Sequence, residues 1–356
     1  MQADKPKTAP KTVSQTVRTL RERILLRPRL PVWRLRLAFG LLMLAFSEMV
    51  AWQNPPARQW FEWPLLVILY TCVGAFFLDV AVRFSARSPA AIGMACGVYG
   101  LIVSAVFHHT AYVSFPFGLL LRGLGLQVGM GFLGLMTFIL VMRGRQVEPL
   151  YLVGVALTGV AWGIWIHWFP LQETANWGLV TLESAQVWLI VPLVVAGAAF
   201  ELLVPRFGTV REPQIALTWW EAILFGAPLF FALLIGLLTN AIPAPLLLLP
   251  AAIGAYCVWA LRFQAAENEP SILAEITFAA PNLITYVILV GGMLLAGSLS
   301  YGLVDGPNSP FGVALYFIVL GFGTAWLPFA SGLMFWTVLR TDYPARRKAR
   351  NKANKR

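Results

Sequence analysis

Ionisable side chains inside long apolar runs are the residues of this sequence that could do chemistry. A charged group that is unpaired in hydrocarbon is costly, so it usually has a binding or catalytic reason to be there. Counting from the ends of the runs gives an outer layer, made of Glu48, His108, His109, Arg122, His167, Glu183 and Gln186. It also gives an inner layer, made of Asp79, Glu201 and Glu221. The middle of the runs is nearly free of charge.

Arg122 stands in a stripe of glycines. The stripe steps by four, three and four positions through Gly118, Arg122, Gly125 and Gly129. On a helix, this spacing leaves bare backbone around one guanidinium. A cation about one turn below the surface needs an acidic partner or an anionic ligand, and Glu48 and Glu183 lie at the matching depth. The alternatives are tight helix packing by the glycines, a structural Arg–carboxylate pair, and a substrate site.

Glu183 and Glu201 share one helical face, because the 18 positions between them make five full turns. We expect this face to line a pathway, the alternative being two independent anchors near the interfaces. The predicted substrate or ion pathway contains Glu48, Arg122, Gln127, His167, Glu183, Gln186 and Glu201. Asp79 and Glu221 form the predicted inner layer; Asp79 has the spacing of a surface ion pair with Arg83, and Glu221 faces Glu201 or Arg206.

We predict no bound metal or cofactor. His108 and His167 could face one another as haem ligands or lie near a quinone headgroup, but a histidine at a helix end more often binds solvent or headgroups. Cys72, Cys96 and Cys257 fall inside apolar runs without a disulfide or zinc-site spacing. No nucleotide-binding loop, GxSxG or HExxH pattern is present.

Ten apolar runs of about 20 residues must position these groups. The hydrophobic fraction is 58%, and the runs lack the alternation of a membrane β-barrel, so we predict an all-α integral membrane protein. The predicted spans are Trp33–Trp52, Phe61–Val82, Pro89–His108, Phe117–Met142, Pro149–Trp168, Leu179–Val204, Thr218–Thr239, Pro245–Leu261, Pro281–Val304 and Phe311–Leu339.

Lys and Arg set the predicted orientation. They gather in alternate loops and in both tails, whereas Arg58 is the only cation in a predicted outer loop. The positive-inside rule therefore puts both termini in the cytosol, in the cytoplasmic membrane of the cell. The net charge of +11 is explained by contact with the anionic cytosolic leaflet, so lipid is the expected partner and nucleic acid is not.

The chain divides by charge and hydropathy. A basic tail (residues 1–32), with an amphipathic pattern over 13–24, precedes spans one to four (33–142) and five to eight (143–264). An acidic loop (265–280), the last two spans (281–340) and a second basic tail (341–356) follow. Acidic residues followed by Arg-Phe near 79 and 201 suggest a parallel repeat of four spans. Gly292 and Ala296 are spaced for close helix contact, so the last pair is expected to pack or to dimerise.

Three functions fit these features. The first is a permease-type transporter of a small, anionic solute, which agrees with many spans, two charge layers and proline-interrupted helices. The second is a non-catalytic or quinone-interacting subunit of a larger membrane complex, using the outer layer. The third is an intramembrane enzyme acting on a lipid or an isoprenoid, although the sequence lacks the paired acids or nucleophile–base spacing that such enzymes need.

Overall fold

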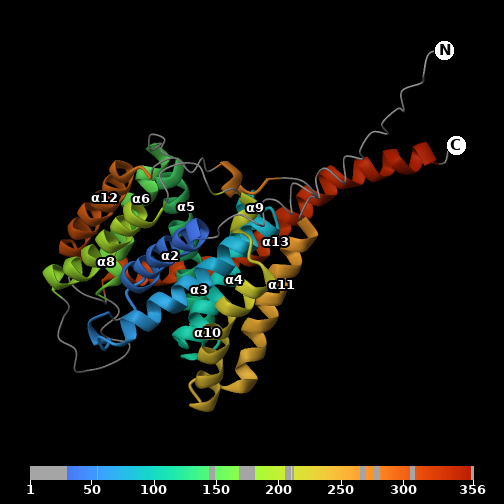
Figure 1. The fold of residues 1–356 in the computed structure, drawn as a ribbon. Helices are drawn as coiled ribbons and strands as arrows, with labels where there is room; N and C mark the ends of the chain where they lie inside the picture. The colour runs from blue at the N-terminus through green and yellow to red at the C-terminus, as the bar shows by residue number, and fades with distance from the viewer. Residues whose placement is uncertain are drawn as a thin grey trace, which may run out of the picture.

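The computed structural model describes residues 30–53, 55–143, 149–167, 181–204, 210, 212–264, 270–275, 281–304 and 309–353. The described residues are helical with short connections (Figure 1). The main helices are α2 (Leu30–Leu44), α3 (Glu62–Arg83), α4 (Pro89–Ile102), α5 (Val128–Arg143), α6 (Pro149–Trp165), α8 (Leu182–Leu203), α9 (Glu212–Ile215), α10 (Trp219–Leu238), α11 (Leu248–Gln264), α12 (Leu283–Gly302) and α13 (Pro310–Ala353). The predicted amphipathic segment of the N-terminal tail lies outside the described residues.

Three of these helices change to π-helical winding. The segment η1 (Ala45–Val50) continues α2, η3 (Val103–Phe107) continues α4, and η5 (Leu119–Gln127) precedes α5. Short 3₁₀ turns are η2 (Pro55–Ala57), η4 (Thr110–Tyr112), η6 (Ala244–Leu247) and η7 (Ile272–Glu275).

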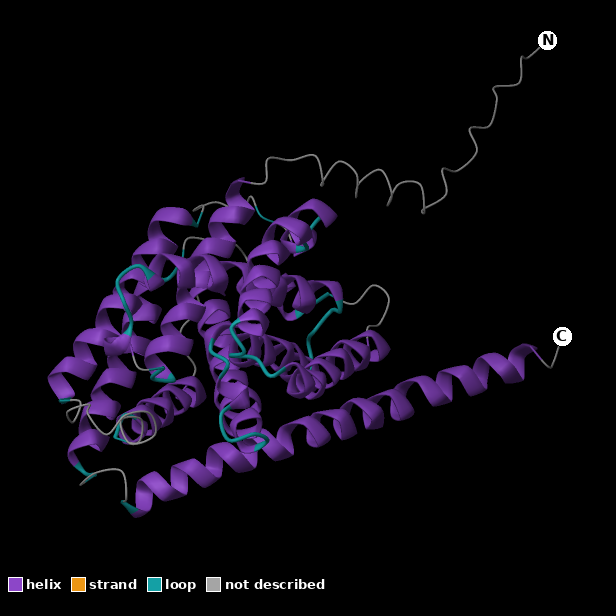
Figure 2. Ribbon diagram, turned by 90° about the horizontal axis from the view of Figure 1, so that it is seen from below, coloured by secondary structure: helices purple, strands orange, loops and turns teal. Residues whose placement is uncertain are grey.

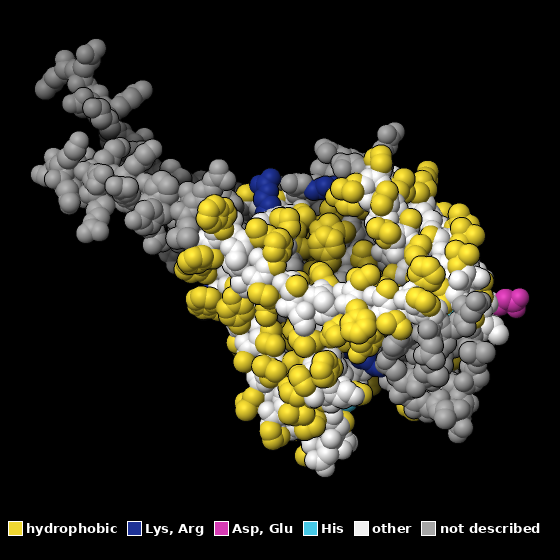
Figure 3. Space-filling view, turned by 180° about the vertical axis from the view of Figure 1, so that it is seen from behind, with side chains coloured by type: hydrophobic (Ala, Val, Ile, Leu, Met, Phe, Trp, Pro, Cys, Tyr) yellow, Lys and Arg dark blue, Asp and Glu magenta, His cyan; other side chains and the backbone are white. Residues whose placement is uncertain are grey.

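The membrane-protein class is supported by helix length and composition. Within the described residues, nine helices are long and apolar enough to cross a membrane. The predicted fifth span appears as α6, a shorter apolar helix of 17 residues within the described part of the chain. Apolar side chains are spread over the described part of the face seen in Figure 3, and Lys and Arg appear at its upper edge and at one place lower down. Ten spans and cytosolic termini stay predictions.

Four helices form the buried core. These are α2, α3, α4 and α5, which pack against one another. The ring centroid of Phe39 on α2 lies 6.0 Å from that of Phe77 on α3 and 4.9 Å from that of Phe138 on α5. Gly40 permits the closest approach of α2 and α3, because a Cβ there would lie 2.6 Å from the Cα of Thr71. α6, α8 and α12 lie on one side of this core, and α10 and α11 on another (Figure 1).

The helix α13 runs beside the bundle as one long rod (Figure 2) and contacts α4, η5, α6 and α11. It therefore joins the peripheral helices on the two sides of the core.

The repeat of four spans stays a prediction, and the two sets of helices that it would relate pack differently. The first four helices form a closed group, but α6 and α8 pack against α12 and α2, whereas α10 and α11 pack against α3 and α4. The second set is thus divided between two sides of the first set, and α6 packs mainly against α12 instead of against the core.

The last predicted pair also separates. α12 packs against α6, where Gly159 and Gly163 meet the backbone carbonyls of Met293 and Gly297. Ala296 lies in this contact as expected, but a Cβ on Gly292 would meet only Val155, at 3.9 Å. The close-contact glycine of α12 is therefore Gly297, one position from the predicted Ala296, because the partner helix is α6 and not α13.

Candidate functional site

Glu48 is fully buried in the π-helical segment η1. The backbone amides of Ala51 and Gln53 donate to the carbonyls of Phe46 and Glu48, five positions back, at 3.0 and 2.8 Å. This wider winding is uncommon in helices and is found often at functional sites. It places the Glu48 carboxylate inside the bundle, at the end where α2 stops and α3 begins.

Three other side chains surround the Glu48 carboxylate. Oε2 accepts hydrogen bonds from Nη2 and Nε of Arg58 at 2.7 and 3.0 Å. Oε1 accepts from the hydroxyl of Tyr70 at 2.8 Å and lies 2.8 Å from Nε2 of His108. We call Glu48, Arg58, Tyr70 and His108 the Glu48 network. They come from η1, the following loop, α3 and the C-terminal cap of η3, so four different segments meet at one carboxylate.

Hydrogen-bond donors decide the tautomer of His108. Nδ1 lies 3.1 Å from Nη2 of Arg58, and a guanidinium can only donate, so Nδ1 is the acceptor. The proton is therefore assigned to Nε2, which faces Glu48 and lies 3.0 Å from the Tyr70 oxygen. In this arrangement His108 donates from Nε2 toward the carboxylate that also pairs with Arg58.

Arg58 connects the network to the surface. Its side chain is 17% exposed, and Nη1 also contacts Glu62 at 3.3 Å. Burial alone would lower the pKa of Arg58, but the neighbouring Glu48 carboxylate raises it, so the guanidinium stays charged. In the sequence, Arg58 indicated only topology, and Tyr70 was not predicted to be a site residue. The usable signal was the presence of one lone cation in an otherwise cation-free outer loop.

Arg122 lies elsewhere, buried in the π-helical segment η5. Of the two acidic partners predicted for Arg122, Glu48 contacts the guanidinium of Arg58 instead, and Glu183 is exposed on α8. In the glycine stripe, a Cβ on Gly125 would lie 2.6 Å from the Val319 carbonyl of α13, whereas Gly129 faces open space. The helix α13 therefore fills part of the expected groove, and Gly118 packs instead against the loop carbonyl of Val113.

The predicted pathway face of α8 points outward. Glu183 is exposed, and between it and Glu201 the side chains of Val187 and Val194 are 60% and 61% exposed. The helix buries the opposite, apolar face, which contains Leu189 and Leu193, so the stripe does not line the interior of the bundle as expected. Gln186 turns sideways and donates to the Ser298 hydroxyl of α12 at 2.7 Å.

Gln127 and His167 are not part of the Glu48 network. Gln127 is fully buried at the end of η5, and its amide atoms have no hydrogen-bond partner among the described residues. His167 lies 3.2 Å from the Tyr301 carbonyl and stacks on its ring, away from the partners of His108. The two histidines therefore have different neighbours. In the described part of the chain, no group of three His, Cys, Asp or Glu side chains could hold a metal ion.

The inner residues join α10 to the core. Asp79 binds Arg83 at 2.9 Å, as its spacing predicted, and also accepts from the Leu217 amide at 2.7 Å. Glu221 pairs with the fully buried Arg36 at 3.1 Å and accepts from the Trp33 indole at 2.8 Å, whereas its predicted alternative partner Arg206 lies outside the described residues. Arg36 was missed because a lone arginine early in an apolar run resembles a topology signal.

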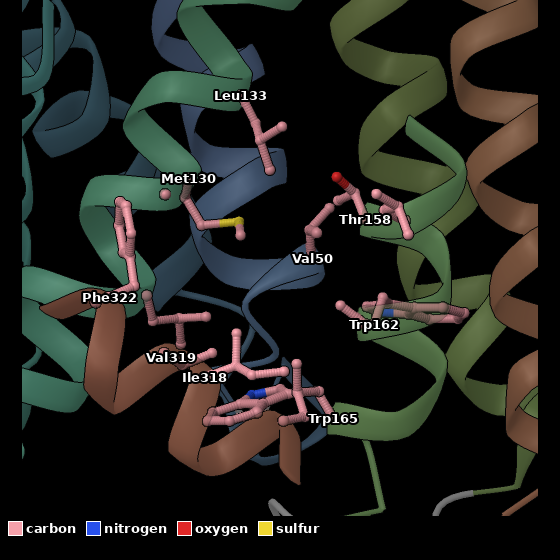
Figure 4. Close-up of a pocket in the computed structure, with 15 residues that line it drawn as sticks. Val50, Met130, Leu133, Thr158, Trp162, Trp165, Ile318, Val319 and Phe322 are labelled. Carbon is pink, nitrogen blue, oxygen red and sulfur yellow. The ribbon is translucent and has the colours of Figure 1, made fainter. Parts of the chain in front are cut away.

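An apolar pocket of about 340 Å³ lies on another side of η1 (Figure 4). Val50 lines it, together with Gly129 and Met130 of α5, Trp162 and Trp165 of α6, and Val319 of α13. The two indole N–H groups donate to the carbonyls of Met49 and Ala51 at 3.1 and 3.0 Å. The tryptophans therefore present apolar ring surface to the pocket.

No family model, curated protein or solved structure matches this chain in the comparisons.

Proposed function

We propose that this polytopic membrane protein is a permease-type transporter of a small anionic solute, with the Glu48 network as its solute gate. The observation that supports this proposal best is the fully buried carboxylate held by a partly exposed arginine inside a helical bundle. Ionisable groups at such positions commonly mark substrate or ion routes.

The chemistry of the gate follows from its partners. Arg58 is the one network member with a notable exposed fraction, so an arriving anion meets its guanidinium first. A carboxylate or phosphate has the same acceptor geometry as Glu48 and can replace it on Arg58. Tyr70 and His108 then hold Glu48 in place during the exchange. Both η1 and η3 are π-helical, a winding found often at functional sites.

Uptake into proteoliposomes tests the proposal. The purified chain is reconstituted and supplied in turn with labelled monocarboxylates, dicarboxylates, phosphate and sulfate. We expect uptake of at least one class, reduced at least tenfold by Glu48→Gln and by Arg58→Gln. Glu62→Gln is the matched control, because Glu62 touches the same arginine from the exposed side and its loss should change uptake less than twofold.

Thermal unfolding of each variant shows whether the variant still folds, so that reduced uptake by a folded variant is assigned to the gate. Failure of the folded wild-type protein to take up any of these anions would overturn the proposal. Equal uptake by the wild type, Glu48→Gln and Arg58→Gln would also overturn it.

A quinone-interacting subunit is the second candidate, and the apolar pocket favours it. Val50 of the pocket and Glu48 of the network share the segment η1, so an isoprenoid tail in the pocket would lie close to a polar headgroup site. Organic extraction of the purified protein should then yield a quinone. Gly129→Leu should remove it by occupying the pocket, because Gly129 lines the pocket and an added Cβ there would meet no atom within 4 Å, whereas Gly291→Leu on the open face of α12 should not. Quinone-free wild-type protein would exclude this candidate.

A further inference from the structure

A second cavity lies outside the Glu48 network, between α4, α10 and α11. Its volume is about 500 Å³, and it is lined by Leu101 and Ile102 of α4, Leu233 of α10, and Gly254 and Val258 of α11. A Cβ on Gly254 would meet only the Leu101 side chain, at 3.8 Å, so bare backbone forms part of the floor. The walls of this cavity therefore form an aliphatic groove along a membrane-spanning helix.

One end of this groove is charged. Arg262, in the last turn of α11, lines the groove and is exposed. Trp259, one turn earlier, also lines it and is 58% exposed, with its ring 5.8 Å from those of Tyr256 and Phe263. Aromatic residues beside a cation at a helix end are typical of the headgroup region of a bilayer. The groove therefore has a polar mouth at the membrane surface and an apolar body within the span.

We propose that this groove binds an anionic phospholipid, with the phosphate on Arg262 and an acyl chain along α4 and α11. The guanidinium can bind two phosphate oxygens at once, and basic pockets between membrane helices suit lipid headgroups. A protein partner would leave Arg262 facing apolar surface unless it brought an acid, whereas a phospholipid supplies both the anion and the chain. The groove shares no residue with the Glu48 network, so this inference is independent of the proposed transport.

Native mass spectrometry of the purified full chain in detergent tests the site, with phosphatidylglycerol as the anionic probe and phosphatidylcholine as the neutral one. We expect tighter binding of phosphatidylglycerol. Arg262→Gln should weaken its binding about fivefold, the effect of one cation near a membrane surface. Gly254→Leu should weaken the binding of both lipids, because the leucine occupies the floor of the groove.

Two matched controls make the result specific. Arg34→Gln removes another exposed cation at the same end of the bundle, and Gly291→Leu adds the same side chain at an open helix face. Both should leave the affinities unchanged. The proposal is wrong if Arg34→Gln and Arg262→Gln have equal effects, since binding would then reflect diffuse charge. It is equally wrong if Gly254→Leu binds both lipids as Gly291→Leu does, or if the wild-type protein does not prefer phosphatidylglycerol.

Discussion

Individual charges in the interior of this protein are held by several partners each. Glu48 and Arg36 are both fully buried, and their carboxylate and guanidinium contact an opposite charge as well as neutral hydrogen-bonding groups. Removing one member of a buried pair typically costs about 3–5 kcal/mol, because the other charge stays behind unpaired. The Glu48 network therefore stabilises the fold as well as forming the proposed gate, which is why its variants must be checked for folding.

His109 provides a pH-dependent test at the level of one residue. Burial lowers the pKa of His109 below its ordinary 6.5, a hydrogen bond with the Val106 backbone opposes this change, and His108 adds to it. The folded state thus binds the proton more weakly than the unfolded state. Stability should be unaffected above about pH 7 and should fall as the pH drops below 6.5.

We expect the melting temperature of the wild-type protein to fall between pH 7 and pH 5, and His109→Asn to reduce that fall. Asparagine is chosen because it tolerates the left-handed backbone at this position, where φ is 55°. Melting curves recorded across this pH range provide the measurement. An identical pH dependence in the variant would show that His109 is protonated as easily in the folded as in the unfolded protein.

Helix pairs in this fold are selected by small residues and by which face is apolar. α6 and α12 approach closely because Gly159 and Gly163 face Gly297, and α8 buries its aliphatic face while Glu183 stays outside. In a membrane, lipid solvates apolar side chains well, so close backbone packing contributes much of the preference for one neighbour. Spacing within one helix cannot identify that neighbour.

Gly163→Ala should disrupt the α6–α12 contact. Its added Cβ would overlap the carbonyl of Gly297 and the hydroxyl of Ser300. Overpacking of this kind typically costs about 1–3 kcal/mol, so we expect a lower melting temperature. Gly291→Ala on the open face of α12 is the control and should be neutral or slightly stabilising, because alanine favours helix. A stable Gly163→Ala protein would mean that the two helices are not in contact at this position.

The whole molecule is a compact four-helix core with peripheral helices that expose much of their apolar surface. The peripheral helices α8, α10, α11, α12 and α13 carry many exposed large apolar side chains, as expected of surfaces that contact lipid. The three cysteines are all buried, which gives a low background for thiol labelling of introduced sites.

Thiol labelling of cysteines introduced at two exposed alanine positions tests the predicted orientation. Ala241 lies between α10 and α11, and Ala274 lies in η7 at the other end of the bundle. If the positive-inside rule holds, a membrane-impermeant thiol reagent should label Ala241→Cys in intact cells. Ala274→Cys should react only after the membrane is permeabilised. The reverse pattern would place the termini outside.

Hydropathy and charge establish the all-helical membrane class and the approximate ends of most spans, because burial in lipid acts on each segment separately. They also single out Glu48 and His108 as unusual. Only the tertiary structure shows that Arg58 and Tyr70 complete this site. They lie 10 and 22 positions from Glu48, beyond a loop and a helix boundary, so no fixed helical period predicts their contacts. The tertiary structure likewise pairs Arg36 with Glu221, 185 positions apart, and leaves Glu183 of α8 exposed. Periodicity defines the faces of a helix, but the packing of all helices together decides which face is buried and against which neighbour.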